Sequence, residues 1–255
     1  MRNALTICRR ELYSYFVSPI AWVLLALFAF LSGVFTYLFS SDFVQRTLQS
    51  QMRGNAVPMS VNEMVIAPLF GNIAVIGLFL IPLISMRLFA EEKRQGTIEL
   101  LITSPVHDLE IVIGKWMAAV LMYSALLGVL LLDISFLFFY GNPDWKPVFT
   151  GFLGLLLQGA CLLAFGAFIS TLTKNQIVAG AVGFAFALLL WILSWWSSLG
   201  DSVPIRVVSY LSIVSHMESF SRGVIDSKDL IYYFSMITLG LFLTTRSLES
   251  LRWRA

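Results

Sequence analysis

Residues 86–106 read MRLFAEEKRQGTIELLITSPV and place a dense cluster of charges between two long apolar runs. The run before it, residues 64–86, holds no ionisable side chain, and a second uncharged run begins at Trp116. A helix crosses the hydrocarbon of a bilayer with about 20 apolar residues, so both runs are candidates to span it. The stretch therefore predicts a charged connection between two membrane spans.

The whole chain has the composition of an integral membrane protein. Of its 255 residues, 58% are hydrophobic and 13% are charged, and the mean hydropathy is +0.82. Such a chain cannot bury its apolar side chains inside a water-soluble globule. Uncharged windows predict an all-α membrane fold, with residues 1–255 forming a single domain of six transmembrane helices. Their approximate bounds are 19–40, 64–86, 115–140, 148–171, 177–198 and 230–247.

The distribution of Lys and Arg predicts the orientation of these spans. Positive residues near a membrane are retained on its cytoplasmic side. If both termini are cytoplasmic, the segments on that side carry most of the 17 Lys and Arg residues, so the bias favours this orientation. The formal net charge of +2 is too small to indicate a nucleic-acid partner.

Residues 1–18 predict an amphipathic helix that lies on the inner leaflet. The Ser18-Pro19 step would turn the chain into the first span, because proline disfavours helix at the preceding residue. The alternative is that this segment is the frayed start of the first span. The uncharged run that follows is longer than the apolar core of a signal peptide, so no cleavage is expected. Apolar residues recur at helical spacing at Leu5, Cys8, Leu12, Tyr15 and Phe16.

Residues 42–63 are predicted on the outer side of the membrane. They are polar and include Gly54 and Pro58, which indicates a flexible surface loop that a periplasm-facing partner could contact. In the span predicted at 115–140, Asp133 is the one carboxylate, and an interfacial position or a hydrogen bond between helices is favoured over proton coupling. Small and polar residues in the fourth and fifth spans predict close helix packing: Gly151, Gly154, Gln158, Gly159, Gly166, Gly180, Gly183 and Ala187.

Residues 202–229 form a second outer segment. It is too long for a simple turn and its apolar runs are too short to span, so it predicts short helices that lie in or re-enter the outer leaflet. His216, Glu218 and Arg222 suggest a site, but solvated or interfacial polar side chains are the favoured interpretation. The expected helix end and the candidate caps of the sixth span are Gly223, Asp226 and Ser227.

The sequence offers little for catalysis or cofactor binding. It has no G-x-x-x-x-G-K-[ST] loop to hold nucleotide phosphates, so we expect no ATPase activity in this chain. His107 and His216 are predicted on opposite sides of the membrane, and no Cys/His cluster has the spacing of a metal site. Cys8 is predicted in the cytoplasm and Cys161 within a span, so no disulfide is expected.

The charged stretch that opens this section ends in a short apolar helix after Gly96-Thr97. Ser104-Pro105 would close that helix. Its apolar side chains are either covered by a cytoplasmic partner or buried because the helix folds back onto the inner leaflet. Charge and periodicity alone do not distinguish these alternatives.

Three stretches resemble the ABC-2-type transporter permeases. AEEKRQGTIELLITSPV, residues 90–106, resembles the signature of the cytoplasmic coupling helix in that family. RRELYSYFVSPIAW, residues 9–22, resembles the family's N-terminal interfacial helix and carries Arg9, Arg10 and Glu11. SHMESFSRGVIDSKDLIYY, residues 215–233, resembles the segment before the last span, especially in the gliding-motility-type branch; it carries His216, Arg222, Gly223 and Asp226.

The resemblance implies roles for the residues of the coupling stretch. In the family this helix docks into a groove on a cytoplasmic ATPase subunit. Acidic side chains would pair with basic groups of the ATPase, and apolar side chains would fill its groove. Gly96 would permit a tight turn, and Thr97 would cap the helix. The acidic candidates are Glu91, Glu92 and Glu99, and the apolar ones are Ile98, Leu100 and Leu101.

The resemblance also implies the assembly. The chain is expected to be the permease subunit of an ATP-binding-cassette exporter in a bacterial inner membrane, in contact with membrane lipids. It would form half of a pathway with a second copy or a related permease. Two ATPase subunits would bind the ATP and Mg²⁺, and a periplasm-facing auxiliary protein is possible in the gliding-motility branch. The work would be export or mechanical work on the envelope. A membrane scaffold that transports nothing is the alternative.

Overall fold

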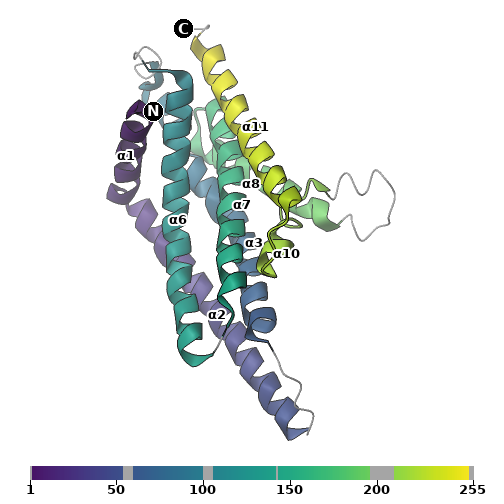
Figure 1. Cartoon of the computed structure of the whole chain (residues 1–255). Coiled ribbons are helices and arrows are strands. Elements are labelled where there is room, and N and C mark those ends of the chain that lie inside the picture. The colour runs from purple at the N-terminus through teal and green to yellow at the C-terminus, as the bar shows by residue number, and fades with distance from the viewer. Residues whose placement is uncertain (1, 54–59, 100–105, 142, 196–209, 253–255) are drawn as a thin grey trace.

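The computed structural model describes residues 2–53, 60–99, 106–141, 143–195 and 210–252, which are almost entirely helical (Figure 1). Five helical runs are long and apolar enough to cross a membrane, which confirms the all-helical prediction and five of its candidate spans. These runs are Pro19–Met52, Asn62–Gln95, Asp108–Phe139, Trp145–Leu172 and Gln176–Trp195.

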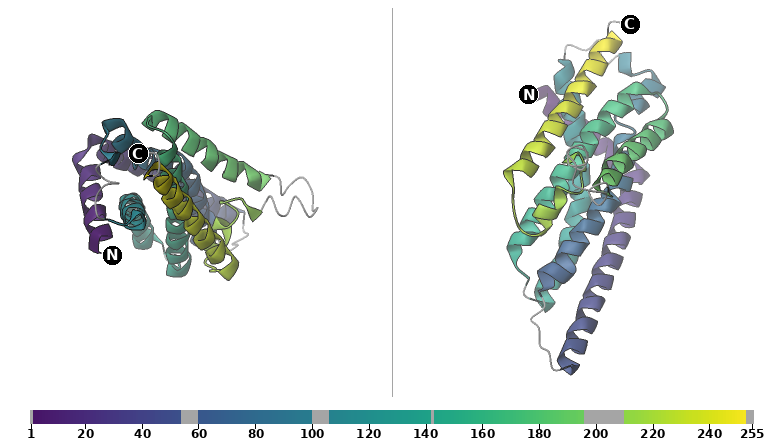
Figure 2. Two further views of the ribbon diagram at one scale, coloured as in Figure 1. Left: turned by 90° about the horizontal axis from the view of Figure 1, so that it is seen from above. Right: turned by 90° about the vertical axis from the view of Figure 1, so that its right-hand side faces the viewer.

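The described elements are α1 (Arg2–Val17), α2 (Pro19–Met52), a π-helical turn η1 (Asn62–Ile66), α3 (Ala67–Ser85), α4 (Ala90–Gln95), α6 (Asp108–Tyr140), α7 (Trp145–Leu172), α8 (Gln176–Ile192), α10 (Met217–Ser221) and α11 (Ser227–Arg252). Both ends of the chain lie at the same end of the molecule (Figure 1). Helix α2 extends beyond the other helices at the opposite end (Figure 2).

Helix α7 forms the centre of the bundle. It packs against α3, α6, α8, α10 and α11, and 78% of its apolar window is buried, against 17% for α2. Its small residues make these contacts possible: a Cβ added at Gly159 would overlap the ring of Tyr123, and one at Gly166 would overlap Ser85. The close packing predicted for this span is therefore confirmed, and it serves contacts within the chain.

The break between α1 and α2 lies where the sequence predicts it. Ser18 has an extended backbone, its Oγ accepts a hydrogen bond from the Ile20 amide at 3.4 Å, and Pro19 opens α2. The indole of Trp22 donates to the carbonyl oxygen of Phe16 at 3.0 Å, which fixes the angle between the two helices. Helix α1 consequently lies along the outside of the bundle, next to α6 (Figure 2).

One expected boundary is wrong, and one helix begins before the span that was predicted within it. The loop predicted from residue 42 is helical as far as Met52, because polar residues end a membrane span without ending a helix. Arg46 pairs with Asp42 at 2.8 Å on one face of this extension, and the first strong helix breakers come only after Met52. Helix α6 begins at Asp108, earlier than the predicted 115, so Lys115 lies inside the helix.

Asp133 makes the predicted hydrogen bond between helices. The hydroxyl of Ser32 on α2 lies 2.5 Å from Oδ2 of Asp133 on α6, and Ser32 is fully buried. A carboxylate in an apolar layer needs such a partner, since an unpaired one is costly there. The pair therefore links α2 to α6.

Candidate functional site

The chain bends sharply between α3 and α4, and one side chain of α7 holds this bend. The Oγ of Ser170 accepts hydrogen bonds from the amides of Phe89 and Ala90, at 3.0 and 2.9 Å. It donates to the carbonyl oxygen of Met86 at 3.0 Å. Phe89 and Ala90 are fully buried, so water cannot replace these bonds. The start of α4 is consequently fixed to the centre of the bundle.

Helix α4 ends at Gly96. This residue has φ +70°, and its amide donates to the carbonyl oxygen of Glu92. A left-handed conformation favours glycine, so the predicted tight turn is confirmed. The hydroxyl of Thr97 lies 3.5 Å from the same oxygen. Its proposed capping role stays a prediction, because the segment that it would cap continues outside the described residues.

A buried lysine connects α4 to two other helices. Lys115 of α6 has only 1% of its side chain exposed. Its Nζ lies 3.0 Å from Oε1 of Glu11 on α1 and 2.9 Å from Oε1 of Glu92 on α4. It also lies 5.4 Å from the ring centroid of Phe89. Removing an ammonium from water is costly unless a group of opposite charge pairs with it. Here the carboxylates of Glu11 and Glu92 both pair with the ammonium of Lys115.

A second cation completes the group. Nη2 of Arg10 lies 2.8 Å from Oε1 of Glu11 and 3.4 Å from Oε1 of Glu92. Arg10, Glu11, Glu92 and Lys115, here called the four-charge cluster, therefore hold two positive and two negative charges. Burial alone would raise the pKa of the Glu11 carboxyl, but the neighbouring Lys115 and Arg10 more than offset burial and lower this pKa.

The four-charge cluster borders a cavity of about 690 Å³ beneath α4. Arg87 and Glu91, which pair at 3.3 Å, line the same cavity. Oε2 of Glu92 is buried and has no hydrogen-bond partner among the residues that the structure describes. Acidic and basic side chains therefore both line this cavity, which lies where α1, the α3–α4 bend and α6 meet.

The structure brings together two groups that the sequence analysis named separately. Arg10 and Glu11 come from the predicted interfacial helix, whereas Glu92 comes from the predicted coupling stretch. Arg9 is exposed and lies outside this cluster, Ile98 is half-buried and Glu99 is exposed. Leu100 and Leu101 lie outside the described residues.

Lys115 was missed by the sequence analysis, although a signal was present. It follows Ile111 by four residues and precedes Met122 by seven, and all three lie on the buried face of α6. Glu11 likewise lies between Cys8 and Tyr15 on the buried face of α1. A lysine and a glutamate at core positions of neighbouring helices indicate that the two side chains pair.

Comparison with known proteins identifies the family. Residues 5–245 match the family of ABC-2 family transporter proteins. The chain belongs to the ABC-2 transporter family. Over 162 residues it is 25% identical to the "Probable multidrug ABC transporter permease YbhR" of Escherichia coli strain K12 and, by the same measure, of strain O157:H7. The match covers 63% of this chain and 43% of each relative, so the chain spans less than half their length.

Family membership makes this chain a multi-pass membrane protein and a permease subunit of an ABC-2-type transporter. Among the residues that the structure describes, no group of three or more His, Cys, Asp or Glu side chains is placed to hold a metal ion.

A second polar site of the permease lies in the segment before α11. Helix α10 is followed by Gly223 with φ +87°, and the amide of Val224 donates to the carbonyl oxygen of Ser219 at 3.1 Å. The predicted helix end at Gly223 is therefore confirmed. Oδ1 of Asp226 accepts a hydrogen bond from the amide of Lys228 at 3.1 Å, which confirms Asp226 as a cap of α11.

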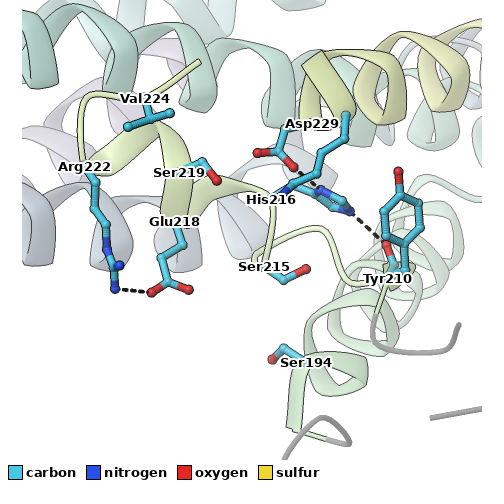
Figure 3. Close-up of a pocket in the computed structure, with 10 residues that line it drawn as sticks. Ser194, Tyr210, Ser215, His216, Glu218, Ser219, Arg222, Val224 and Asp229 are labelled. Carbon is cyan, nitrogen blue, oxygen red and sulfur yellow. Dashed lines mark hydrogen bonds and ion pairs between the residues drawn. The ribbon is translucent and has the colours of Figure 1, made fainter. Parts of the chain in front are cut away.

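His216 of the permease is buried, contrary to the favoured interpretation. Its Nδ1 lies 2.6 Å from Oδ1 of Asp229, and its Nε2 lies 2.8 Å from the carbonyl oxygen of Tyr210 (Figure 3). Only 4% of His216 is exposed. The solvated interpretation holds for Glu218 and Arg222, which are exposed and pair at 2.5 Å. The sequence analysis missed Asp229 because the turn after Gly223 brings it back beside His216.

Proposed function

We propose that the chain is one half of the membrane pathway of an ATP-driven exporter in a bacterial inner membrane, with both termini in the cytoplasm. The position of both termini at one end of the bundle supports an even number of crossings (Figure 1). Most of the Lys and Arg residues fall on this side if it is cytoplasmic, which supports the orientation.

Helix α11 is the sixth span in this proposal. It has 26 residues and packs along α7. Lys228 and Arg246 bracket its membrane-spanning part, and the 18 steps from one to the other rise about 27 Å, close to the thickness of a hydrocarbon layer of about 30 Å. Its outer surface exposes Ile231, Phe234 and Phe242, as expected for contact with lipid.

The observation that carries the proposed mechanism is the shared pairing of Lys115. Glu92 belongs to the stretch that resembles the coupling helix, and Glu11 belongs to α1. A displacement of α4 toward or away from the bundle would move Glu92 relative to Lys115. The buried ammonium of Lys115 is costly to leave unpaired, so it would have to follow. Movement of a docked ATPase would therefore reach α6 and α1 together, and the packing of two permease copies would change in response.

The partners follow from the same account. Two ATPase subunits bind Mg²⁺ and ATP and hold the coupling stretch, in which Glu99 is exposed and Ile98 is half-buried. Glu92 pairs with Lys115 and Glu91 pairs with Arg87. These two ion pairs hold the coupling stretch against the helical bundle. A second copy or a related permease completes the pathway.

The finer assignment is the gliding-motility-type branch, supported by the resemblance of residues 215–233. The work would then be export or mechanical work on the envelope, with a periplasm-facing auxiliary protein on the outer side. The relatives named above are described as multidrug permeases, which favours export.

The test is binding of the ATPase by a permease with an altered turn. Gly96→Trp places a large side chain on a left-handed residue at the docking surface, and we expect it to release the ATPase in a pull-down from membranes. Gly71→Trp is the matched control, because a Cβ at Gly71 also meets open space but lies elsewhere on the bundle. Normal ATPase binding by Gly96→Trp would contradict the docking role of this turn. If the ATPase does not bind even the wild-type chain, the scaffold alternative is favoured.

A further inference from the structure

A polar cavity of about 610 Å³ lies where the start of α11, α10 and the end of α8 meet (Figure 3). Its lining includes both signs of charge, from Glu218, Arg222, Lys228 and Asp229. Nothing in the proposed coupling mechanism uses these side chains. The cavity is therefore a candidate for binding a ligand that itself carries both charges.

The protons of the His216–Asp229 pair can be counted from its geometry. The carbonyl oxygen of Tyr210 only accepts, so Nε2 of His216 carries a proton. Nδ1 lies 2.6 Å from a carboxylate oxygen of Asp229, so one further proton lies between them, on either group. In both arrangements the pair has no net charge. Oδ2 of Asp229 is buried and has no hydrogen-bond partner among the described residues, so it remains an acceptor without a donor.

Two cations lie on the exposed part of the same cavity. The side chains of Arg222 and Lys228 are 71% and 60% exposed. Their present partners, Glu218 at 2.5 Å and Asp226 at 3.0 Å, are also exposed, and surface pairs of this kind contribute little. Either cation could therefore bind a phosphate without a large loss of existing interactions.

The exposed apolar face of α11, here called the groove, continues from the polar cavity. Lys228 of the polar cavity and Ile231, Ser235, Thr238 and Phe242 of the groove follow one another at spacings of three or four residues, so they share one face of the helix. From Ile231 to Phe242 the helix rises about 16 Å, which is roughly half of a hydrocarbon layer of about 30 Å. The groove thus has the length of one acyl chain in one leaflet.

We propose that the polar cavity and the groove together bind one phospholipid whose head group carries a phosphate and a primary ammonium, as in phosphatidylethanolamine. The phosphate binds Lys228, the ammonium donates to Oδ2 of Asp229, and an acyl chain lies along α11. Phosphatidylcholine carries the same phosphate but no N–H donor, so it leaves Oδ2 without a partner. The proposal rests on α11 being the sixth span of the proposed function.

The test is retention of lipid by the permease purified without its ATPase. The protein is equilibrated with equal amounts of phosphatidylethanolamine and phosphatidylcholine with the same acyl chains, and bound lipid is counted by native mass spectrometry. We expect a preference for phosphatidylethanolamine of about tenfold, the scale of a hydrogen bond to a charged group. Asp229→Asn should reduce the preference toward parity, whereas Arg222→Gln with Lys228→Gln should reduce retention of both lipids.

Arg246→Gln is the control, since it removes an exposed cation at the other end of α11 and should leave retention and preference unchanged. Equal retention of the two lipids by the unaltered protein would overturn the proposal. So would retention that persists in the Arg222→Gln, Lys228→Gln variant, which alters only exposed side chains and is expected to fold. Because no ATPase is present, a failure of ATP coupling leaves these results unaffected.

Discussion

Nζ of Lys115 on α6 lies 2.9 Å from Oε1 of Glu92 on α4, with the lysine side chain almost completely buried. Lys115→Met would leave Glu92 and Glu11, whose side chains are 15% and 18% exposed, with the exposed Arg10 as their one remaining cation in the four-charge cluster. We expect it to destabilise the permease by about 3 kcal/mol, the usual scale for breaking a buried ion pair from one side. Thermal unfolding in detergent measures this loss.

The matched control is Lys146→Met, which removes an exposed lysine of α7. It should leave the unfolding temperature unchanged. If Lys115→Met were as stable as this control, the pairing of Lys115 would contribute nothing to stability.

The second prediction concerns pH. The pKa of Glu11 is lowered from its ordinary value of 4.5. The folded protein therefore holds this carboxylate ionised more strongly than the unfolded chain does. The resulting stabilisation is fully present above pH 4.5 and is lost as the pH falls through the lower, folded pKa. We expect the unfolding temperature of the wild-type permease to fall in this acid range, and Glu11→Gln to flatten part of that decline. An identical decline in both proteins would contradict the assignment.

The third prediction concerns the bend held by Ser170. Ser170→Ala removes the acceptor of two buried amides and the donor to Met86, and each unsatisfied buried group costs about 1–3 kcal/mol. We expect faster hydrogen exchange at the amides of Phe89 and Ala90. Ser250→Ala, at an exposed position of α11, is the control. Unchanged exchange at the bend would show that Ser170 does not hold it.

The fourth prediction concerns close packing in α7. Gly159→Ala would force its Cβ into the ring of Tyr123, so we expect a loss of about 1–3 kcal/mol. The same change at Gly33 of α2 meets no atom within 4 Å and should be neutral or stabilising by up to about 1 kcal/mol. Unfolding by denaturant compares the two variants, and equal stability would exclude a tight contact at Gly159.

The sequence predicts the local features of the fold well, because each depends on a few adjacent residues. The Ser18-Pro19 break, the turn at Gly96 and the cap at Asp226 each follow from backbone chemistry within one turn. The end of α2 was mispredicted because polarity marks where a chain leaves the membrane, whereas helices end at breakers and caps. Six spans were expected, and within the part of the chain that the structure describes five helical runs meet the length and hydropathy of a span.

The candidate site was only partly predictable. The acidic stretch and Glu11 were named from the sequence, but their common partner Lys115 lies 104 positions from Glu11 in the chain. A single sequence does not show which helices pack side by side, so the pairing of buried charges across helices has to come from the structure. His216 shows the same limit over a shorter distance, because only the turn at Gly223 brings Asp229 beside it.

The most direct test of coupling uses the double variant Lys115→Met, Glu92→Met. Replacing both partners of a buried ion pair with apolar side chains is often close to neutral for stability, so this variant should fold and bind the ATPase. We predict that ATP hydrolysis by the reconstituted complex falls at least about fivefold, which corresponds to about 1 kcal/mol. Wild-type turnover by a folded double variant with its ATPase bound would contradict the claim that the four-charge cluster transmits movement to the bundle.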